Sequence, residues 1–187
     1  MLLLELFTDP YEWEEHEEND GGDASTFVFK TDKGIPYDVD FERINTPADD
    51  IPLWSVEFSN QAKQTSPNNR FGITGSGNSP QVLATVMDIV QDFAQSHGGV
   101  YTFSASEPSR SSLYARVLKR FIQPPLVTGT LPALDGGQLF FVGMPDDVQK
   151  FKDRKEKELA YRREYEQNQA GSSDAQPQQG VNNNATV

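Results

Sequence analysis

The sequence predicts an α+β fold, with a mixed, mainly antiparallel sheet, two central helices and a charged C-terminal helix. Two observations carry this prediction. In the first third of the chain, apolar and polar side chains alternate, which is typical of strands that bury one face. In the middle of the chain, two stretches with apolar side chains at helical spacing flank a segment rich in β-formers, residues 100–105. A helix, a strand and a helix joined by short loops are expected to pack on one sheet through a right-handed crossover.

Residues 26–44 predict a β-hairpin. Phe27 and Phe29 share one face of its first strand, and a turn follows at residues 32–34. In its second strand, acidic side chains alternate with three apolar ones, Tyr37, Val39 and Phe41. One face of this pair is therefore expected to be buried and the other to be solvated.

Further strands are expected at residues 2–6, 53–58, 71–73 and 138–143. The second of these directs three apolar side chains inward, namely Trp54, Val56 and Phe58. The acidic residues 9–23 predict a solvated loop or a surface helix, with a cation site and a polyanion mimic as the functional alternatives. Residues 128–137 predict a turn-rich connection.

Residues 80–93 predict the first central helix. Asn78 or Ser79 is the expected N-cap, since Pro80 favours the first helical position. Apolar side chains then recur over three turns, and the glycines at 98 and 99 predict a left-handed stop. The second central helix is expected to start near Ser106 or Ser109, to end before Pro124, and to bury Leu113, Val117 and Phe121.

Three parts are expected along the chain. Residues 1–144 form the α/β domain, and residues 145–169 form a charged helix supported by acidic and basic pairs four residues apart. Residues 170–187 form a disordered polar tail, because its Gln, Asn, Ser and Gly residues cannot build a core.

The composition excludes several kinds of site. The chain has no cysteine and only two histidines, His16 and His97. A disulfide framework, a thiolate nucleophile, a cysteine-based zinc site and a histidine-rich metal centre are therefore excluded, and no metal is expected.

The charge is concentrated in the first third of the chain. Residues 1–60 contain 16 acidic and 3 basic side chains, and the net charge of the whole chain is −12. Such a segment repels a polyanion, so nucleic-acid binding is not expected. The apolar start is interrupted by Glu5 and lacks the basic residues of a signal peptide, and no run approaches the ~20 apolar residues of a membrane helix. We expect a cytoplasmic protein without a membrane segment.

A glycine turn precedes the first central helix. Gly75 and Gly77 bracket Ser76, and Asn78 follows, so main-chain N–H groups can approach a ligand beside a helix N-terminus. This arrangement favours an anion site suited to phosphate, and a plain tight turn is the alternative. The turn lacks the Gly-Lys-Ser/Thr end of a Walker loop, and Pro80 occupies the place of the third glycine of a Rossmann fingerprint.

The order of the expected elements resembles the acyl-CoA N-acyltransferase superfamily, the GNAT fold, over residues 26–143. In that family a Gly-x-Gly/Ala loop holds the pyrophosphate of acetyl-CoA on backbone amides. The resemblance therefore implies acetyl-CoA as cofactor, bound through Gly75, Ser76, Gly77 and Asn78. The sequence departs from the family at Gly72, where the family loop has Gln or Arg, and at residues 9–26, which leave little room for the helices that shape the acceptor site.

The same resemblance implies catalytic residues. Leu113-Tyr114 is similar to a Leu-Tyr pattern in which the Tyr is the general acid for the leaving thiolate. Glu57 has the position of the Glu that often acts as the base on the preceding strand. A small-molecule amine or a protein amine would be the acceptor.

Two hypotheses stay open. The protein is an N-acyltransferase, or it is a non-catalytic interaction protein on the same scaffold that binds a basic protein partner. Residues 73–77 and 107–114 are also similar to segments of small uncharacterised proteins of tailed bacteriophages, which implies a location in the bacterial host cytoplasm and no particular activity.

Overall fold

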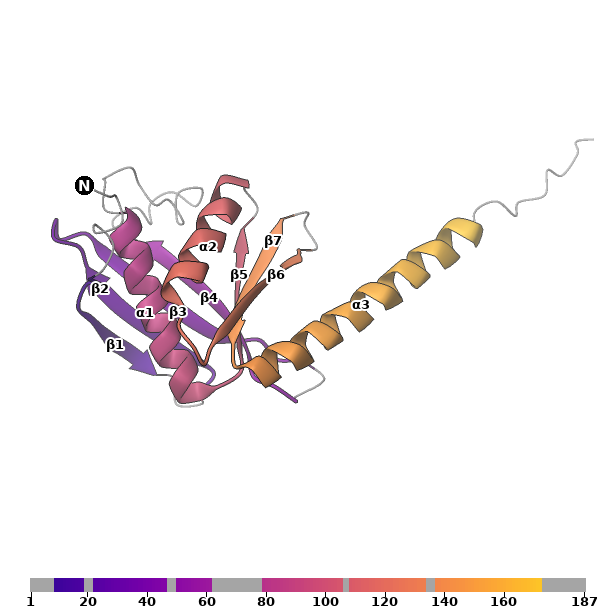
Figure 1. Cartoon of the computed structure of the whole chain (residues 1–187), viewed down its shortest axis with the longest axis horizontal. Coiled ribbons are helices and arrows are strands. Elements are labelled where there is room, and N and C mark those ends of the chain that lie inside the picture. The colour runs from indigo at the N-terminus through magenta and orange to yellow at the C-terminus, as the bar shows by residue number, and fades with distance from the viewer. Residues whose placement is uncertain are drawn as a thin grey trace, which may run out of the picture. The chain divides into compact units, whose positions relative to one another are not determined.

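The computed structural model describes residues 9–18, 22–46, 50–61, 79–105, 108–133 and 137–172. Within these residues the fold is α+β, with one seven-stranded sheet and three helices (Figure 1). The strands are β1 (Trp13–Glu18), β2 (Ala24–Lys30), β3 (Pro36–Arg43), β4 (Leu53–Asn60), β5 (Val100–Ala105), β6 (Val127–Pro132) and β7 (Gln138–Gly143). The helices are α1 (Ser79–His97), α2 (Pro108–Phe121) and α3 (Pro145–Ser172). The chain divides into two units between Phe151 and Lys152, within α3.

The strand order in the sheet is β1-β2-β3-β4-β5-β7-β6. Neighbouring strands are antiparallel except for β4 and β5, which are parallel and are connected through α1. The predicted α+β class and the mixed, mainly antiparallel sheet are therefore confirmed. The arrangement is compatible with a GNAT-like fold.

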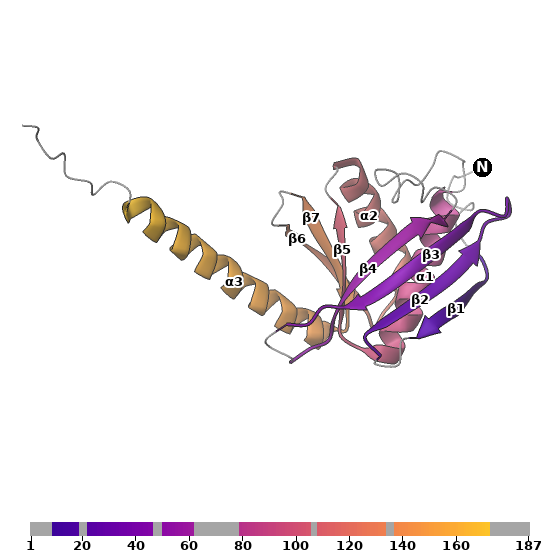
Figure 2. The same cartoon turned by 180° about the vertical axis from the view of Figure 1, so that it is seen from behind.

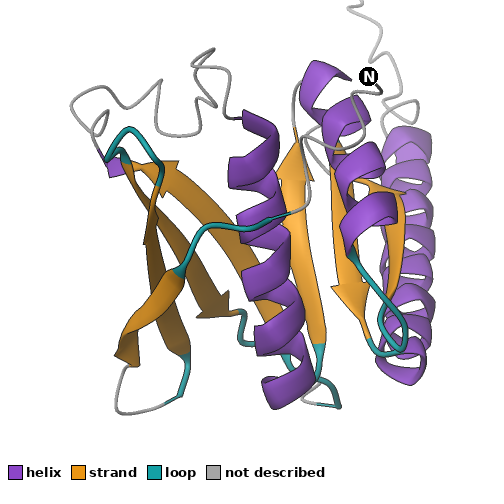
Figure 3. Cartoon of the chain, turned by 60° about the vertical axis from the view of Figure 1, so that its left-hand side comes forward, coloured by secondary structure: helices purple, strands orange, loops and turns teal. Residues whose placement is uncertain are grey.

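Helices α1 and α2 lie together on one face of the sheet (Figure 3). Phe93 of α1 is central to the contact, because its ring lies 4.2 Å from that of Phe41 and 5.3 Å from that of Trp54. On α2, Tyr114 packs edge-on against Phe140 of β7, with 5.7 Å between the ring centroids. Alternate residues of β2, β3, β4, β5 and β7 supply this core, as the period of two in the sequence predicts.

The other face of the sheet carries a smaller apolar cluster. It is formed by Ile51, Leu53, Val100, Phe141, Val148 and Phe151, of which the last two belong to the first turns of α3. The N–H of Gly99 donates to Oδ2 of Asp147, over 3.2 Å, and so links the start of α3 to the turn before β5. The turn itself needs glycine, since Gly98 and Gly99 have φ angles of 63° and 88°.

A segment before β1 crosses the outer surface of α1 (Figure 3). The side chain of Gln81 donates to the carbonyl of Asp9, and the N–H of Tyr11 donates to Oγ1 of Thr85, each over 2.9 Å. These two residues of α1 are four apart, so they lie on one side of the helix. The segment is therefore fixed along the first turns of α1.

Most predicted elements are confirmed. The hairpin is formed by β2 and β3, and the predicted strands 53–58, 100–105 and 138–143 are β4, β5 and β7. Both central helices are present, and the first ends at His97, immediately before the two glycines. The strands predicted at 2–6 and 71–73, and most of the predicted tail (residues 173–187), lie outside the described residues.

The prediction of a solvated loop or a surface helix at the acidic residues 9–23 is wrong, because this segment contains the edge strand β1. The ring of Trp13 packs against Phe27 at 5.5 Å, and that of Tyr11 packs against Phe29 at 6.0 Å. These contacts and the pairing with β2 outweigh the low strand propensity of the glutamates.

The prediction of a turn-rich connection at residues 128–137 is also wrong, since most of β6 lies within this stretch. Gly129, which suggests a turn, is instead covered by the ring of Phe141, and a Cβ at Gly129 would lie 2.3 Å from that ring. Pro132 ends the strand at the sheet edge, where a missing N–H is tolerated.

Candidate functional site

Strands β4 and β5 part after a short parallel pairing. In the described residues the pairing joins Leu53 with Val100, Trp54 with Tyr101 and Ser55 with Thr102, and it extends no further. Both strands nevertheless continue, and Figure 2 shows them diverging toward their carboxyl ends. We call the region between residues 56–60 of β4 and residues 103–105 of β5 the β4–β5 divergence.

Two hydrogen bonds establish which main-chain groups of β4 face β5. The N–H of Val100 donates to the carbonyl of Pro52 over 2.9 Å, and the N–H of Ile44 donates to the carbonyl of Leu53 over 2.7 Å. Main-chain groups of successive residues point to opposite edges of a strand, so even-numbered residues of β4 face β5 and odd-numbered residues face β3.

Val56 and Phe58 therefore direct their N–H and carbonyl groups into the β4–β5 divergence. Both residues are buried, being 6% and 5% exposed. Buried main-chain groups need hydrogen-bond partners. An extended ligand or a chain segment in the divergence would supply them.

The N-termini of both central helices follow the diverging ends of the strands. Helix α1 begins at Ser79, after β4, and α2 begins at Pro108, after β5. In open sheets, ligands bind outside the carboxyl ends of parallel strands, and a helix N-terminus favours an anion. The predicted phosphate-binding residues Gly75, Ser76, Gly77 and Asn78 lie immediately before α1 but outside the described residues.

Tyr114 lies on α2 and is half-buried on the helix-covered face of the sheet. Its ring lies 6.5 Å from that of Phe103 and 5.7 Å from that of Phe140. Phe103 belongs to the diverging part of β5. Tyr114 therefore packs over the diverging part of β5, on the side of β5 that is paired with β7.

Glu57 lies on the opposite face of the sheet from Tyr114. It is exposed, and its neighbours Val56 and Phe58 are in the core that the helices cover. The two predicted catalytic residues are thus not brought into one cluster. Each lies at one of the two strands that border the β4–β5 divergence, however, since Glu57 belongs to the part of β4 beyond the parallel pairing.

The face of β1–β4 that points away from α1 and α2, which we call the open face, is acidic. Glu57 lies directly opposite Asp40 of β3, and Asp38 lies directly opposite Val28 of β2, which itself pairs with Glu14 of β1. Asp38 is only 8% exposed, and its carboxylate accepts a hydrogen bond from Nε2 of Gln61.

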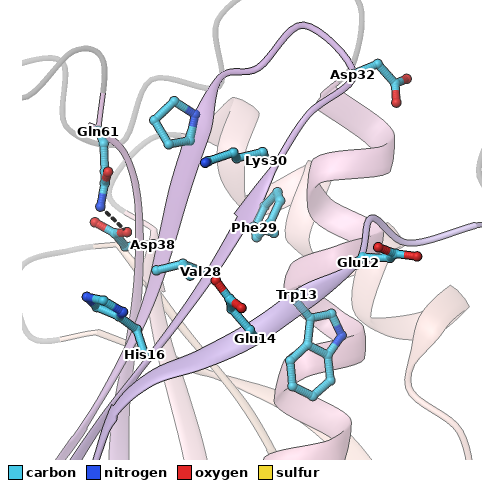
Figure 4. A pocket seen from close by; sticks show the side chains of 11 residues that line it. Glu12, Trp13, Glu14, His16, Val28, Phe29, Lys30, Asp32, Asp38 and Gln61 are labelled. Atoms are coloured by element: carbon cyan, nitrogen blue, oxygen red, sulfur yellow. Dashed lines mark hydrogen bonds between the residues drawn. The ribbon is translucent and has the colours of Figure 1, made fainter.

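A cleft of about 720 Å³ hollows one end of the open face (Figure 4). Its polar groups include Glu14, His16, Lys30, Asp38 and Gln61, and Val28 and Pro36 contribute apolar surface. Sequence reasoning missed this cleft. The alternating acids of β3 mark the solvated side of one strand, but the register that brings β1 beside them is not visible in the sequence.

Among the described residues, no group of three or more His, Asp or Glu side chains is arranged to hold a metal ion. None of the helices in the described ranges is long and apolar enough to span a lipid bilayer.

Comparison with known proteins shows the family to which the chain belongs. No curated protein matches the sequence. Among solved structures, the chain is similar to a ribosomal-protein-S5-alanine acetyltransferase from Vibrio fischeri, with 13% sequence identity and a TM-score of 0.35 over 72% of this chain and 79% of that chain. The family model that matches covers residues 9–126, more than half of the sequence, and is described as a family of unknown function. The chain therefore belongs to the family DUF6934.

Proposed function

We propose that this protein is an N-acyltransferase that binds acetyl-CoA in the β4–β5 divergence. The observation that carries the proposal is the short parallel pairing of β4 with β5, which leaves the main-chain groups of Val56 and Phe58 directed into the divergence. The pantetheine arm of acetyl-CoA is an extended chain with amide groups. Such a chain can pair with the edge of a strand in the way that an added β-strand does.

In this proposal the pyrophosphate of the cofactor binds at the start of α1. The main-chain N–H groups of Gly75, Ser76, Gly77 and Asn78 would donate to its oxygens, and the dipole of α1 would favour the negative charge. A helix of 19 residues without an acidic side chain in its first turn offers this charge no competing carboxylate.

Glu57 and Tyr114 would carry the proton transfers from the two sides of the divergence. Glu57 accepts a proton from the acceptor amine, whose nitrogen then attacks the thioester carbonyl and forms the C–N bond. The C–S bond breaks, and the hydroxyl of Tyr114 protonates the leaving thiolate. The acceptor is a small-molecule amine or a protein amine, and it would approach from the open face, where Glu57 is exposed.

The test is thermal unfolding in the presence of acetyl-CoA. A ligand that binds only the native state stabilises it by about 2.7 kcal/mol at one hundred times Kd, so we expect a higher melting temperature. Gly77→Asp should abolish the increase, because it places a carboxylate where the phosphate binds. Tyr114→Phe should keep the increase and slow the release of free thiol in an acyl-transfer assay.

The alternative is a non-catalytic protein that binds a basic partner. The acidic open face favours it. An unchanged melting temperature at millimolar acetyl-CoA would exclude the cofactor proposal and leave this alternative.

A further inference from the structure

The two edge strands of the described sheet differ in how well they are protected from pairing with another chain. These strands are β1 and β6, which Figure 2 shows at opposite sides of the sheet. Charged side chains and β-bulges commonly protect an edge. Strand β1 has both, since four of its six residues are glutamates and its register with β2 shifts between Glu15 and Glu17. Strand β6 reads Val-Thr-Gly-Thr-Leu-Pro, without a charge, and its register with β7 is regular.

The outer side of β6 presents main-chain groups that its pairing with β7 does not use. The N–H of Ala133 donates to the carbonyl of Gly137 over 3.0 Å, so odd-numbered residues of β6 direct their main-chain groups toward β7. The N–H and carbonyl groups of Thr128 and Thr130 therefore point away from β7. Both residues are exposed, and β7 is the only neighbour of β6 among the described strands. This edge is a template for one more strand.

The side chains of β6 form a pattern that is symmetric about Gly129. Thr128 and Thr130 flank this glycine, and the apolar residues Val127 and Leu131 come next on either side. When two copies of such a strand pair antiparallel about a two-fold axis at Gly129, Thr128 of one copy lies opposite Thr130 of the other. In this register every outward N–H and carbonyl group of the two threonines has a partner.

The same register also pairs the apolar residues. Val127 is 37% exposed, and in the pairing about Gly129 it lies opposite Leu131 of the second copy. Apolar and β-branched residues that face each other across two strands stabilise a sheet. Both faces of the added pairing are thus complementary, with threonine opposite threonine on one face and valine opposite leucine on the other. A strand that complements itself in this way favours a second copy of the chain over an unrelated partner.

The charge distribution also favours a second copy at this edge. The net charge of the chain is −12, and residues 1–60, which include β1–β4, contain 16 acidic and 3 basic side chains. Neighbouring strands lie about 4.8 Å apart, so β4 lies at least about 14 Å from β6. This distance exceeds the Debye length of about 8 Å at physiological salt. Two copies that meet at β6 therefore keep their acidic strands apart, whereas pairing at β1 would set glutamates side by side.

We propose that β6 is an interface at which two copies of this chain form a dimer. The β6 strands of the two copies pair antiparallel about Gly129, and the two sheets become one continuous sheet. A two-fold axis perpendicular to the sheet leaves α1 and α2 of both copies on the same face. The interface does not depend on the proposed acyl transfer, because the β4–β5 divergence lies between two other strands.

The test measures the mass of the full chain by light scattering during size-exclusion chromatography, over a series of concentrations. The mass of the natural chain should approach that of two chains as the concentration rises. Thr128→Lys/Thr130→Lys places like charges directly opposite each other across the axis, so the dissociation constant of the dimer should rise about tenfold or more at low salt. The substitutions also make the net charge less negative, and general repulsion alone would therefore change the dissociation constant in the opposite direction.

The matched variant is Thr128→Lys/Thr130→Glu, which changes the same two exposed positions. In the proposed register it sets opposite charges against each other across the axis, so the dissociation constant should change less than about threefold. Equal weakening of the dimer in the two variants would show that these positions do not face each other and would overturn the proposal. A natural chain that keeps the mass of one copy at every concentration would overturn it as well.

Hydrogen exchange of the natural chain tests the interface without any substitution, which covers the case in which a variant does not fold. The outward N–H groups of Thr128 and Thr130 should exchange more slowly as the concentration is raised. Those of Gly129 and Leu131 face β7 and should be protected at every concentration. Fast exchange at both threonines, independent of concentration, would contradict the dimer.

Discussion

Asp40 on β3 lies directly opposite Glu57 on β4, on the face of the sheet that points away from α1 and α2. The hydroxyl of Thr26 donates to Oδ1 of Asp40 over 2.9 Å and stabilises that carboxylate. It does not separate the two negative charges. Like charges directly opposite each other on neighbouring strands repel, and this repulsion lowers the stability of the fold.

We therefore expect Glu57→Gln to raise the free energy of unfolding. The gain should be about 0.2–1 kcal/mol at low salt and should shrink in ~0.5 M salt, since screening weakens the repulsion that the substitution removes. Urea denaturation at both salt concentrations measures it. Asp92→Asn on α1, which lies away from this pair, is the control and should give no comparable gain. A loss of stability in Glu57→Gln would show that the carboxylate is paired favourably in the fold.

Gly99 should tolerate substitution much less well than its neighbour Gly98. A Cβ at Gly99 would lie 2.4 Å from the carbonyl oxygen of Pro52, whereas a Cβ at Gly98 would meet nothing within 4 Å. Both have positive φ, so Gly98→Ala should cost about 1–2 kcal/mol for conformation alone. Gly99→Ala adds the clash and should cost at least about 2 kcal/mol more, measured by thermal or urea unfolding. Equal losses of stability in the two variants would mean that the main chain around Pro52 and Gly99 shifts enough to relieve the clash.

Tyr101 should make stability depend on pH in the alkaline range. Burial, and then the negative charge of Asp147, raise the pKa of Tyr101 well above its ordinary value of 10.0. The hydroxyl donates to the carbonyl of Gly98 over 2.8 Å and is protonated in the native state. Above pH ~10 the unfolded chain releases this proton and the folded chain keeps it, so the free energy of unfolding falls as pH rises, by roughly 1 kcal/mol per pH unit.

The comparison variant for this prediction is Tyr101→Phe. At neutral pH it loses the hydrogen bond to Gly98 and should be about 1 kcal/mol less stable than the natural chain. Between pH ~9 and ~11 the difference should shrink or reverse, because the variant lacks the titrating group. Parallel stability curves for the two proteins over this range would contradict the assignment.

How much of the fold the sequence predicts depends on whether a pattern is local. The strands at Phe27, Tyr37 and Trp54 alternate strictly, and the two helices have clear start and stop residues, so these elements follow from short stretches of sequence. Strand β1 does not, because its glutamates favour a solvated segment and only the pairing with β2 makes it a strand. Strand β6 does not follow from the local sequence either, because Gly129 suggests a turn and its role depends on the ring of Phe141, twelve residues away.

The candidate site, too, is predicted by the sequence only where the pattern is local. Glu57 and Tyr114 can be proposed from their positions in the sequence, but only the structure shows that they lie at the two strands bordering the β4–β5 divergence, on opposite faces of the sheet. The divergence itself has no sequence signal, since it depends on where a parallel pairing stops. The open face depends on the register of three strand pairs, which alternation alone does not determine.

The first residue of β1 gives a final prediction, about a contact with the middle of α1. Trp13 contacts α1 through its indole N–H, which donates to Oδ2 of Asp88 over 2.9 Å, and its ring packs against Phe27. Trp13→Phe keeps an aromatic ring and removes the donor, and Asp88→Leu removes the acceptor. Each should cost about 1 kcal/mol or somewhat more, because the group left behind is partly buried.

Asp88→Asn is the matched control for this pair, since its amide oxygen can still accept the indole N–H and the loss should be smaller. Because the contact is local, hydrogen exchange should become faster for residues 9–13 and for the turns of α1 around Asp88, and stay unchanged for β7, whose residues Phe140 and Val142 are fully buried. Faster exchange confined to the segment would mean that α1 is held by the sheet core alone. Faster exchange that includes α1 would mean that the contact with Trp13 also holds the helix in place.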